Sequence, residues 1–131
     1  MPRVSLAFFL VGAVFGLLGM MWGLYMGVSQ DFSARDAHAH LNLLGWATLS
    51  LMGAFYALAG LARPKVLSWV NFFLSSVGVI LFVPFLVMVQ RGEPSAPFFA
   101  MGSVGVLMVV LGMATFIAAI VMALLRKPVA V

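Results

Sequence analysis

The chain has 131 residues, of which 65% are hydrophobic and only 8% are charged. A soluble domain carries roughly 25% charged residues, so this composition excludes an ordinary soluble protein and predicts an all-α membrane protein. The formal net charge of +4 is the excess that basic cytoplasmic loops supply, and we do not interpret it as nucleic-acid binding. The absence of cysteine excludes disulfides, thiolate metal sites and cysteine nucleophiles.

Four apolar stretches are long enough to cross a bilayer, which takes about 20 apolar residues per helix. Short polar links separate them, and they lie at about 6–28, 37–62, 66–90 and 97–125. The first stretch is too long for a signal peptide and lacks a clear cleavage site, so we expect it to be retained. Links this short make consecutive helices antiparallel neighbours, which predicts one up-down bundle of four transmembrane helices over residues 1–131.

The charges in the links predict how the bundle sits in the membrane. Five of the seven Lys and Arg residues fall on one side: Arg3, Arg63, Lys65, Arg126 and Lys127. The other two fall on the opposite side together with all three acidic residues: Arg35, Arg91, Asp31, Asp36 and Glu93. The positive-inside rule then gives an N-in/C-in orientation and puts the start of the second helix near the outer face.

The first helix carries glycines at spacings of four, three, four and four residues: Gly12, Gly16, Gly19, Gly23 and Gly27. Glycine at this rhythm allows another helix to approach closely in lipid. Two interpretations are open, namely packing within the chain and contact between subunits. In the third helix, Pro84 predicts a kink.

The start of the second helix contains both histidines of the chain, in the run Arg35-Asp36-Ala37-His38-Ala39-His40. A histidine at membrane depth is costly and is therefore a candidate functional residue. Because an α-helix turns about 100° per residue, His38 and His40 point about 200° apart. The pair cannot easily bind one ion together, but each imidazole can reach a different neighbour.

The residues that share these two faces suggest what the histidines bind. The faces are made of Asn42 and Gly45 with His38, and of Asp36, Leu44 and Ala47 with His40. The small Gly45 and Ala47 are expected to leave room beside each imidazole for a flat, broad group such as a porphyrin, whose iron takes axial imidazoles. Arg35 and Asp36, at the polar end of the helix, are then candidates to meet the propionates.

Other interpretations of the pair are open. Both histidines could be polar residues wetted at the membrane edge that bind nothing. A zinc or copper site needs three or four converging ligands, which a diverging pair does not supply. The methionines of the first helix suit copper but are also common filler in apolar helices. A proton or ion path lacks intermediate sites, because no acidic residue lies deeper in any helix.

The second helix also resembles a known family. The run His38-Ala39-His40-Leu41-Asn42-Leu43-Leu44-Gly45-Trp46, followed by Gly53 and Tyr56, is similar to the tenth helix of the haem-copper oxidase catalytic subunit. It is closest to the cbb3-type oxidase and nitric oxide reductase branches. In that family, one histidine of a His-x-His pair is the proximal ligand of the high-spin haem, and the other is an axial ligand of the low-spin haem. The resemblance implies the first role for His38 and the second for His40.

The resemblance is confined to this helix, and the chain departs from the family elsewhere. Family members have many more helices and further histidines, whereas this chain has no third histidine, so we do not expect a complete oxidase or reductase. The family's helices form three similar four-helix arcs, and a homotrimer of this chain would reproduce that layout. A haem b between protomers would then take His38 from one and His40 from the next, and a dimer that shares haems is also open.

The leading hypothesis from the sequence is therefore a b-type haem protein of a prokaryotic inner membrane. We expect it to act in electron transfer or in redox or gas sensing, with respiratory-chain proteins as partners. One alternative is a cofactor-free or transiently loaded accessory protein that assists assembly of a respiratory complex. Another is a small metal-binding or nitric oxide-response protein linked to denitrification.

Overall fold

The protein is built from long apolar helices. The computed structural model describes residues 1–59, 64–92 and 95–125. Its elements are α1 (Arg3–Ser29), α2 (Arg35–His40), the π-helix η1 (Leu41–Thr48), α3 (Leu49–Ala59), α4 (Lys65–Gln90) and α5 (Ala96–Leu125). Because α2, η1 and α3 follow one another without a break, we call them together the histidine span. With α1, α4 and α5 it makes four helices long and apolar enough to cross a membrane.

The observed helices confirm the prediction of an all-α protein, since the described residues contain no strand. Each predicted helix bound that can be compared lies within about one helical turn of the observed one. The predicted end of the second helix at residue 62 lies outside the described residues. So do four of the charged residues used for the orientation: Arg63, Glu93, Arg126 and Lys127. Helix α4 continues as one helix through Pro84.

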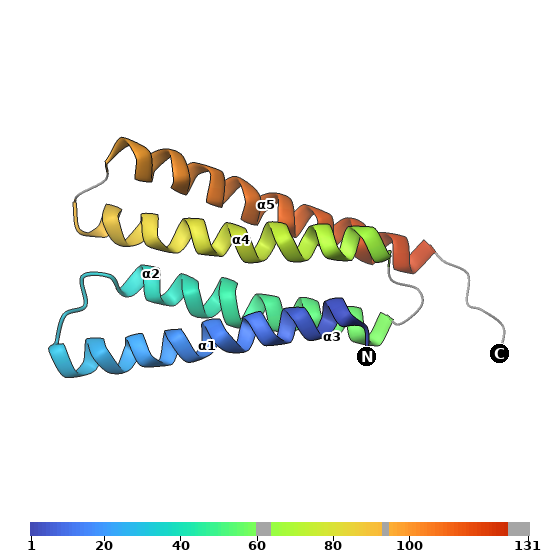
Figure 1. The fold of residues 1–131 in the computed structure, drawn as a ribbon, viewed down its shortest axis with the longest axis horizontal. Helices are drawn as coiled ribbons and strands as arrows, with labels where there is room; N and C mark the ends of the chain where they lie inside the picture. Colours follow the sequence, from blue (N-terminus) through green and yellow to red (C-terminus); the bar gives the residue numbers. More distant parts are fainter. Residues whose placement is uncertain (60–63, 93–94, 126–131) are drawn as a thin grey trace.

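Two helical hairpins lie side by side (Figure 1). One pairs α1 with the histidine span, and the other pairs α4 with α5. Successive helices alternate in direction, so the N-terminus and the end of α5 lie at the same end of the bundle (Figure 1). We call this the terminal end, and we call the opposite end, which holds residues 30–34, the loop end.

Aromatic side chains join the two hairpins near the terminal end. Phe8 of α1 stacks on Tyr56 of α3, with ring centroids 5.5 Å apart, and meets Phe72 of α4 edge-on at 5.1 Å. Phe116 of α5 lies edge-on to Phe55 at 5.3 Å and to Tyr56 at 5.9 Å. All four helices therefore contribute to one aromatic contact region, and the fully buried Phe8 and Tyr56 lie at its centre.

Polar side chains tie the same region together. The Tyr56 hydroxyl donates a hydrogen bond to Asn71 Oδ1 at 3.2 Å, and Asn71 Nδ2 donates to the Gly112 carbonyl at 2.6 Å. Asn71 Nδ2 also lies 3.3 Å from Ser75 Oγ and 3.4 Å from Thr115 Oγ1. These bonds connect α3, α4 and α5, which is how polar side chains commonly join helices inside a membrane.

The glycines of α1 pack against the histidine span. Each of four glycines faces one residue of that span: Gly12 faces Ser50, Gly16 faces Trp46, Gly19 faces Asn42 and Gly23 faces His38. At each of these four positions a Cβ atom would stand 3.1 Å or closer to the facing side chain. Packing within the chain is therefore the correct interpretation for these four glycines. Gly27 differs, since no described atom lies within 4 Å of the position its Cβ would take.

The π-helix η1 explains how the two rows of residues stay aligned. In an unbroken α-helix, which the sequence predicted, residues four apart drift by about 40° per step around the axis. The residues His38, Asn42, Trp46 and Ser50 repeat every four residues, so in an α-helix this row would gradually turn away from α1. The π turn holds one residue more than an α-helical turn, which keeps the row facing α1. Thr48 Oγ1 donates to the Leu43 carbonyl at 2.8 Å within this segment.

Candidate functional site

His38 lies against α1. Its ring meets Trp22 edge-on, with centroids 6.0 Å apart, and its Cε1 is 3.1 Å from the position that a Cβ on Gly23 would take. Its Nδ1 and Nε2 atoms lie 3.4 and 3.5 Å from Asn42 Nδ2. These distances exceed the usual range of about 2.7–3.2 Å for a good hydrogen bond. The half-buried imidazole is thus held by packing, and neither ring nitrogen is committed to a short hydrogen bond in the described structure.

Asn42 follows His38 by one turn and shares its face, as the sequence predicted. Its Nδ2 donates to the His38 carbonyl at 3.0 Å. The amide fits against Gly19, where even a methyl group would collide with it. Gly19 and Gly23 of α1 therefore accommodate the side chains of Asn42 and His38, which explains why α1 can approach so closely.

His40 faces the other hairpin. Its ring meets Phe82 of α4 edge-on, with centroids 5.4 Å apart. Its Nδ1 lies 2.7 Å from the Asp36 carbonyl oxygen. Because a carbonyl only accepts, Nδ1 carries the proton in this hydrogen bond and Nε2 keeps its lone pair. The prediction that His38 and His40 reach different neighbours is confirmed, since one contacts α1 and the other contacts α4.

The charged residues of the predicted site lie at the loop end. Arg35 Nε is 3.5 Å from Asp36 Oδ1, and the two side chains are 77% and 62% exposed. An exposed pair of this kind contributes at most about 1 kcal/mol to stability. This ion pair therefore holds the two side chains only weakly in place.

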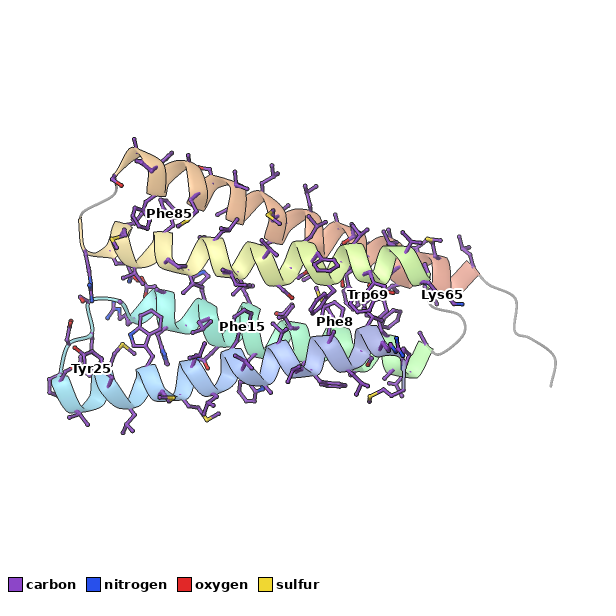
Figure 2. The ribbon with its side chains drawn as sticks, viewed as in Figure 1. Phe8, Phe15, Tyr25, Lys65, Trp69 and Phe85 are labelled. Atoms are coloured by element: carbon purple, nitrogen blue, oxygen red, sulfur yellow. The ribbon has the colours of Figure 1, made fainter. Side chains whose placement is uncertain are left out.

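The space expected beside Gly45 is filled by the protein itself. Phe15 points from α1 toward the histidine span (Figure 2), and its Cδ2 is 2.9 Å from the position that a Cβ on Gly45 would take. The glycine admits a neighbouring aromatic ring rather than leaving a gap. Ala47 is half-buried in η1. Trp22, Phe82 and Phe15 were not part of the predicted site, because no local pattern connects them to the histidines.

Gln90 is a further residue that the sequence did not connect with the histidines. Its Oε1 accepts a hydrogen bond of 3.0 Å from the backbone N–H of Ala37, in the first turn of α2. Among the described residues, no group of three or more His, Cys, Asp or Glu side chains is arranged to hold a metal ion. The two histidines are therefore separate imidazoles in the described structure, each with neighbours of its own.

Comparison of the chain with protein-family models, with curated proteins and with solved structures gives no match. The similarity of the histidine span to the tenth helix of the haem-copper oxidases therefore stays a hypothesis.

Proposed function

We propose that the protein binds haem b through the imidazoles of His38 and His40 and acts in electron transfer or in redox or gas sensing. The observation that supports this most is the hydrogen bond of 2.7 Å from His40 Nδ1 to the Asp36 carbonyl. Histidines that bind metals commonly donate their other ring N–H to a carbonyl or carboxylate, which fixes the tautomer and the ring orientation. His40 already has this arrangement, with Nε2 left for iron.

The residues fit the chemistry of haem, and they also suggest where it binds. Imidazole is a common axial ligand of haem iron, and a bound haem would supply one-electron redox chemistry. Phe15 fills the space at Gly45, so we place the porphyrin outside the single chain rather than within it. His38 and His40 are both half-buried, so neither residue is fully enclosed by its own chain. We therefore propose that His38 of one protomer and His40 of the next hold the same iron, in a homotrimer or a dimer.

We propose that both termini lie in the cytoplasm of a prokaryotic cell and that the loop end faces the opposite side of its inner membrane. Of the described basic residues, Arg3 and Lys65 lie at the terminal end, and Arg35 and Arg91 lie at the loop end. The orientation is supported by the sequence count, in which the positive-inside rule also includes Arg63, Arg126 and Lys127. This orientation puts the histidines close to the outer surface. Arg35, which is largely exposed beside them, would there bind a propionate.

The test is the absorbance spectrum of the purified protein, produced in cells supplied with haem and kept in a mild detergent. We expect a red protein with b-type bands that sharpen on reduction. His38→Ala and His40→Ala should each lose the haem or convert it from low spin to high spin. Leu43→Ala is the control, because Leu43 is an exposed position on the same span. If both histidine variants keep the wild-type spectrum, the ligand assignment is wrong.

A second function is favoured by a different observation. Trp22 and Gly23 pack against the His38 ring and Phe15 fills the space at Gly45, so this part of the chain is well packed without any cofactor. This favours a cofactor-free accessory protein that assists a respiratory complex. A colourless wild-type protein, obtained as a stable species despite ample haem, would support this function and contradict the first.

A further inference from the structure

One peptide group at the start of α2 is bound by side chains at both of its polar ends. The group joins Asp36 to Ala37. Its N–H donates to Gln90 Oε1 at 3.0 Å, and its carbonyl oxygen accepts from His40 Nδ1 at 2.7 Å. Because a peptide group is planar, its N–H and its carbonyl cannot be reoriented independently. Gln90, on another helix and 53 residues along the chain from Ala37, is therefore connected to the His40 ring through a single rigid unit.

The contact exists because α2 lacks a local cap. Helix α2 follows Ala34, whose side chain cannot accept a hydrogen bond. The first N–H groups of a helix have no partner within it, and a side chain before the helix normally binds the third of them. Here Gln90, the last residue of α4, takes that role. Ala34 and Ala37 are small and are 4% and 0% exposed, so nothing larger stands in the way of this contact.

We infer that Gln90 is a positioning residue that fixes the tautomer of His40. By accepting from the peptide N–H, Gln90 polarises the Asp36 carbonyl, which strengthens the hydrogen bond that this carbonyl accepts from Nδ1. The proton is thereby held on Nδ1, and the lone pair is held on Nε2. Phe82 limits the tilt of the ring from the side of α4 but has no polar atom that could select a tautomer. The selection thus depends on the hydrogen-bonded path from Gln90.

This inference rests on the haem proposal in one respect only, namely that the group bound by Nε2 is the haem iron. A histidine whose second nitrogen is fixed by an outer partner is a better oriented and more basic ligand. The path itself is a property of the protein without haem. It can therefore be tested independently of whether haem binds.

The experiment is ¹⁵N NMR of the haem-free protein labelled at histidine. The chain has two histidines, and His38→Gln identifies the signals of His40. In the wild type we expect His40 to be mainly the Nδ1–H tautomer. Gln90→Met removes the acceptor while keeping the length of the side chain. We expect it to shift the tautomer ratio of His40 by about two- to tenfold toward Nε2–H, as losing part of a hydrogen bond implies.

Two further variants separate positioning from general damage. Gln90→Glu keeps an acceptor oxygen and should retain the wild-type ratio. Gln30→Met is the matched control, because Gln30 is an exposed glutamine at the same end whose side chain donates a hydrogen bond to the Gly27 carbonyl of α1. The His38 signals should stay unchanged in all three variants.

The inference is overturned if wild-type His40 is mainly Nε2–H, a result that does not depend on the folding of any Gln90 variant. It is also overturned if Gln90→Met leaves the ratio unchanged, or if Gln90→Glu behaves like Gln90→Met. A His40 tautomer that follows Gln90 in a protein that never binds haem would leave the inference standing and refute the haem proposal. If the protein binds haem but the tautomer of His40 does not respond to Gln90, the haem proposal stands and the inference is refuted.

Discussion

Replacing Gly19 by alanine tests the close approach of α1 to the histidine span. A Cβ at this position would stand 2.6 Å from Asn42 Nδ2 and 2.7 Å from Asn42 Cγ. Favourable contacts of this kind lie at about 3.5–4.0 Å, so the amide has to move. It cannot do so without weakening the hydrogen bond that it donates to the His38 carbonyl at 3.0 Å. From overpacking and the weakened bond together, we expect the free energy of unfolding to fall by about 2–3 kcal/mol.

The assay is unfolding in mixed micelles with rising SDS, followed by circular dichroism. Gly27→Ala is the control on the same helix, because no described atom lies within 4 Å of its Cβ position. Alanine should there be neutral or stabilising by up to about 1 kcal/mol. In the double variant Gly19→Ala/Asn42→Ala the collision is absent. Its loss of stability should therefore be smaller than the sum of the two single losses by about 1 kcal/mol or more.

Two results would contradict the packing of Gly19 against Asn42. One is a Gly19→Ala variant as stable as Gly27→Ala, which would mean that the two helices do not approach at this position. The other is strict additivity in the double variant, which would mean that the methyl group acts elsewhere than on Asn42.

Three further predictions concern other parts of the chain. Deleting Leu43, which is exposed in η1, should convert the π turn into α-helix. The free energy of unfolding in SDS should then change by less than about 1 kcal/mol, whereas deleting the exposed Ile80 of α4 should lower it by more than about 4 kcal/mol. Asn71→Ala should cost about 1–3 kcal/mol in the same assay, because it leaves the buried Tyr56 hydroxyl without its acceptor and removes a hydrogen bond to the Gly112 carbonyl. The backbone N–H of Ser33, and to a lesser extent its hydroxyl, hold the pKa of Asp31 below 3.8. Ser33→Ala should therefore raise the pKa of Asp31 part of the way back, as measured by NMR titration.

The sign of the Asp31 effect follows from linkage. Its pKa is lower in the folded protein than in the unfolded chain, so its stabilisation is present at neutral pH and is lost as the pH falls through the folded value. An unchanged pKa of Asp31 in Ser33→Ala would contradict the contribution of the Ser33 hydroxyl to the lowered pKa.

The other two predictions also have outcomes that would contradict them. If deleting Leu43 is as damaging as deleting Ile80, η1 does not hold a residue that the helix can lose. An Asn71→Ala variant of wild-type stability would contradict the role given to that side chain.

The sequence was sufficient to locate the four helices and to predict that the histidines diverge. Both depend on local rules, namely the length of apolar runs between charged links and the rotation of about 100° per residue in a helix. The divergence is retained because His38 and His40 both lie in α2, ahead of the π turn.

The rest depends on how distant segments fit together. The spacing of the α1 glycines indicates a close approach but does not say which helix approaches. The π turn follows from the match between the α1 glycines and the residues of the histidine span that face them. The sequence does not show this match, and it therefore predicted an unbroken α-helix. Gly45 suggested open space, yet Phe15 packs into it. Gln90 reaches Ala37 across 53 residues, and no periodic pattern signals such a contact.

Haem binding by His40 is tested most directly by a reduced-minus-oxidised absorbance spectrum of the wild-type protein beside His40→Ala. We expect b-type haem bands in the wild type, and their loss or a change to high spin in the variant. A stable but colourless wild-type protein, or identical haem spectra in the wild type and the variant, would contradict it.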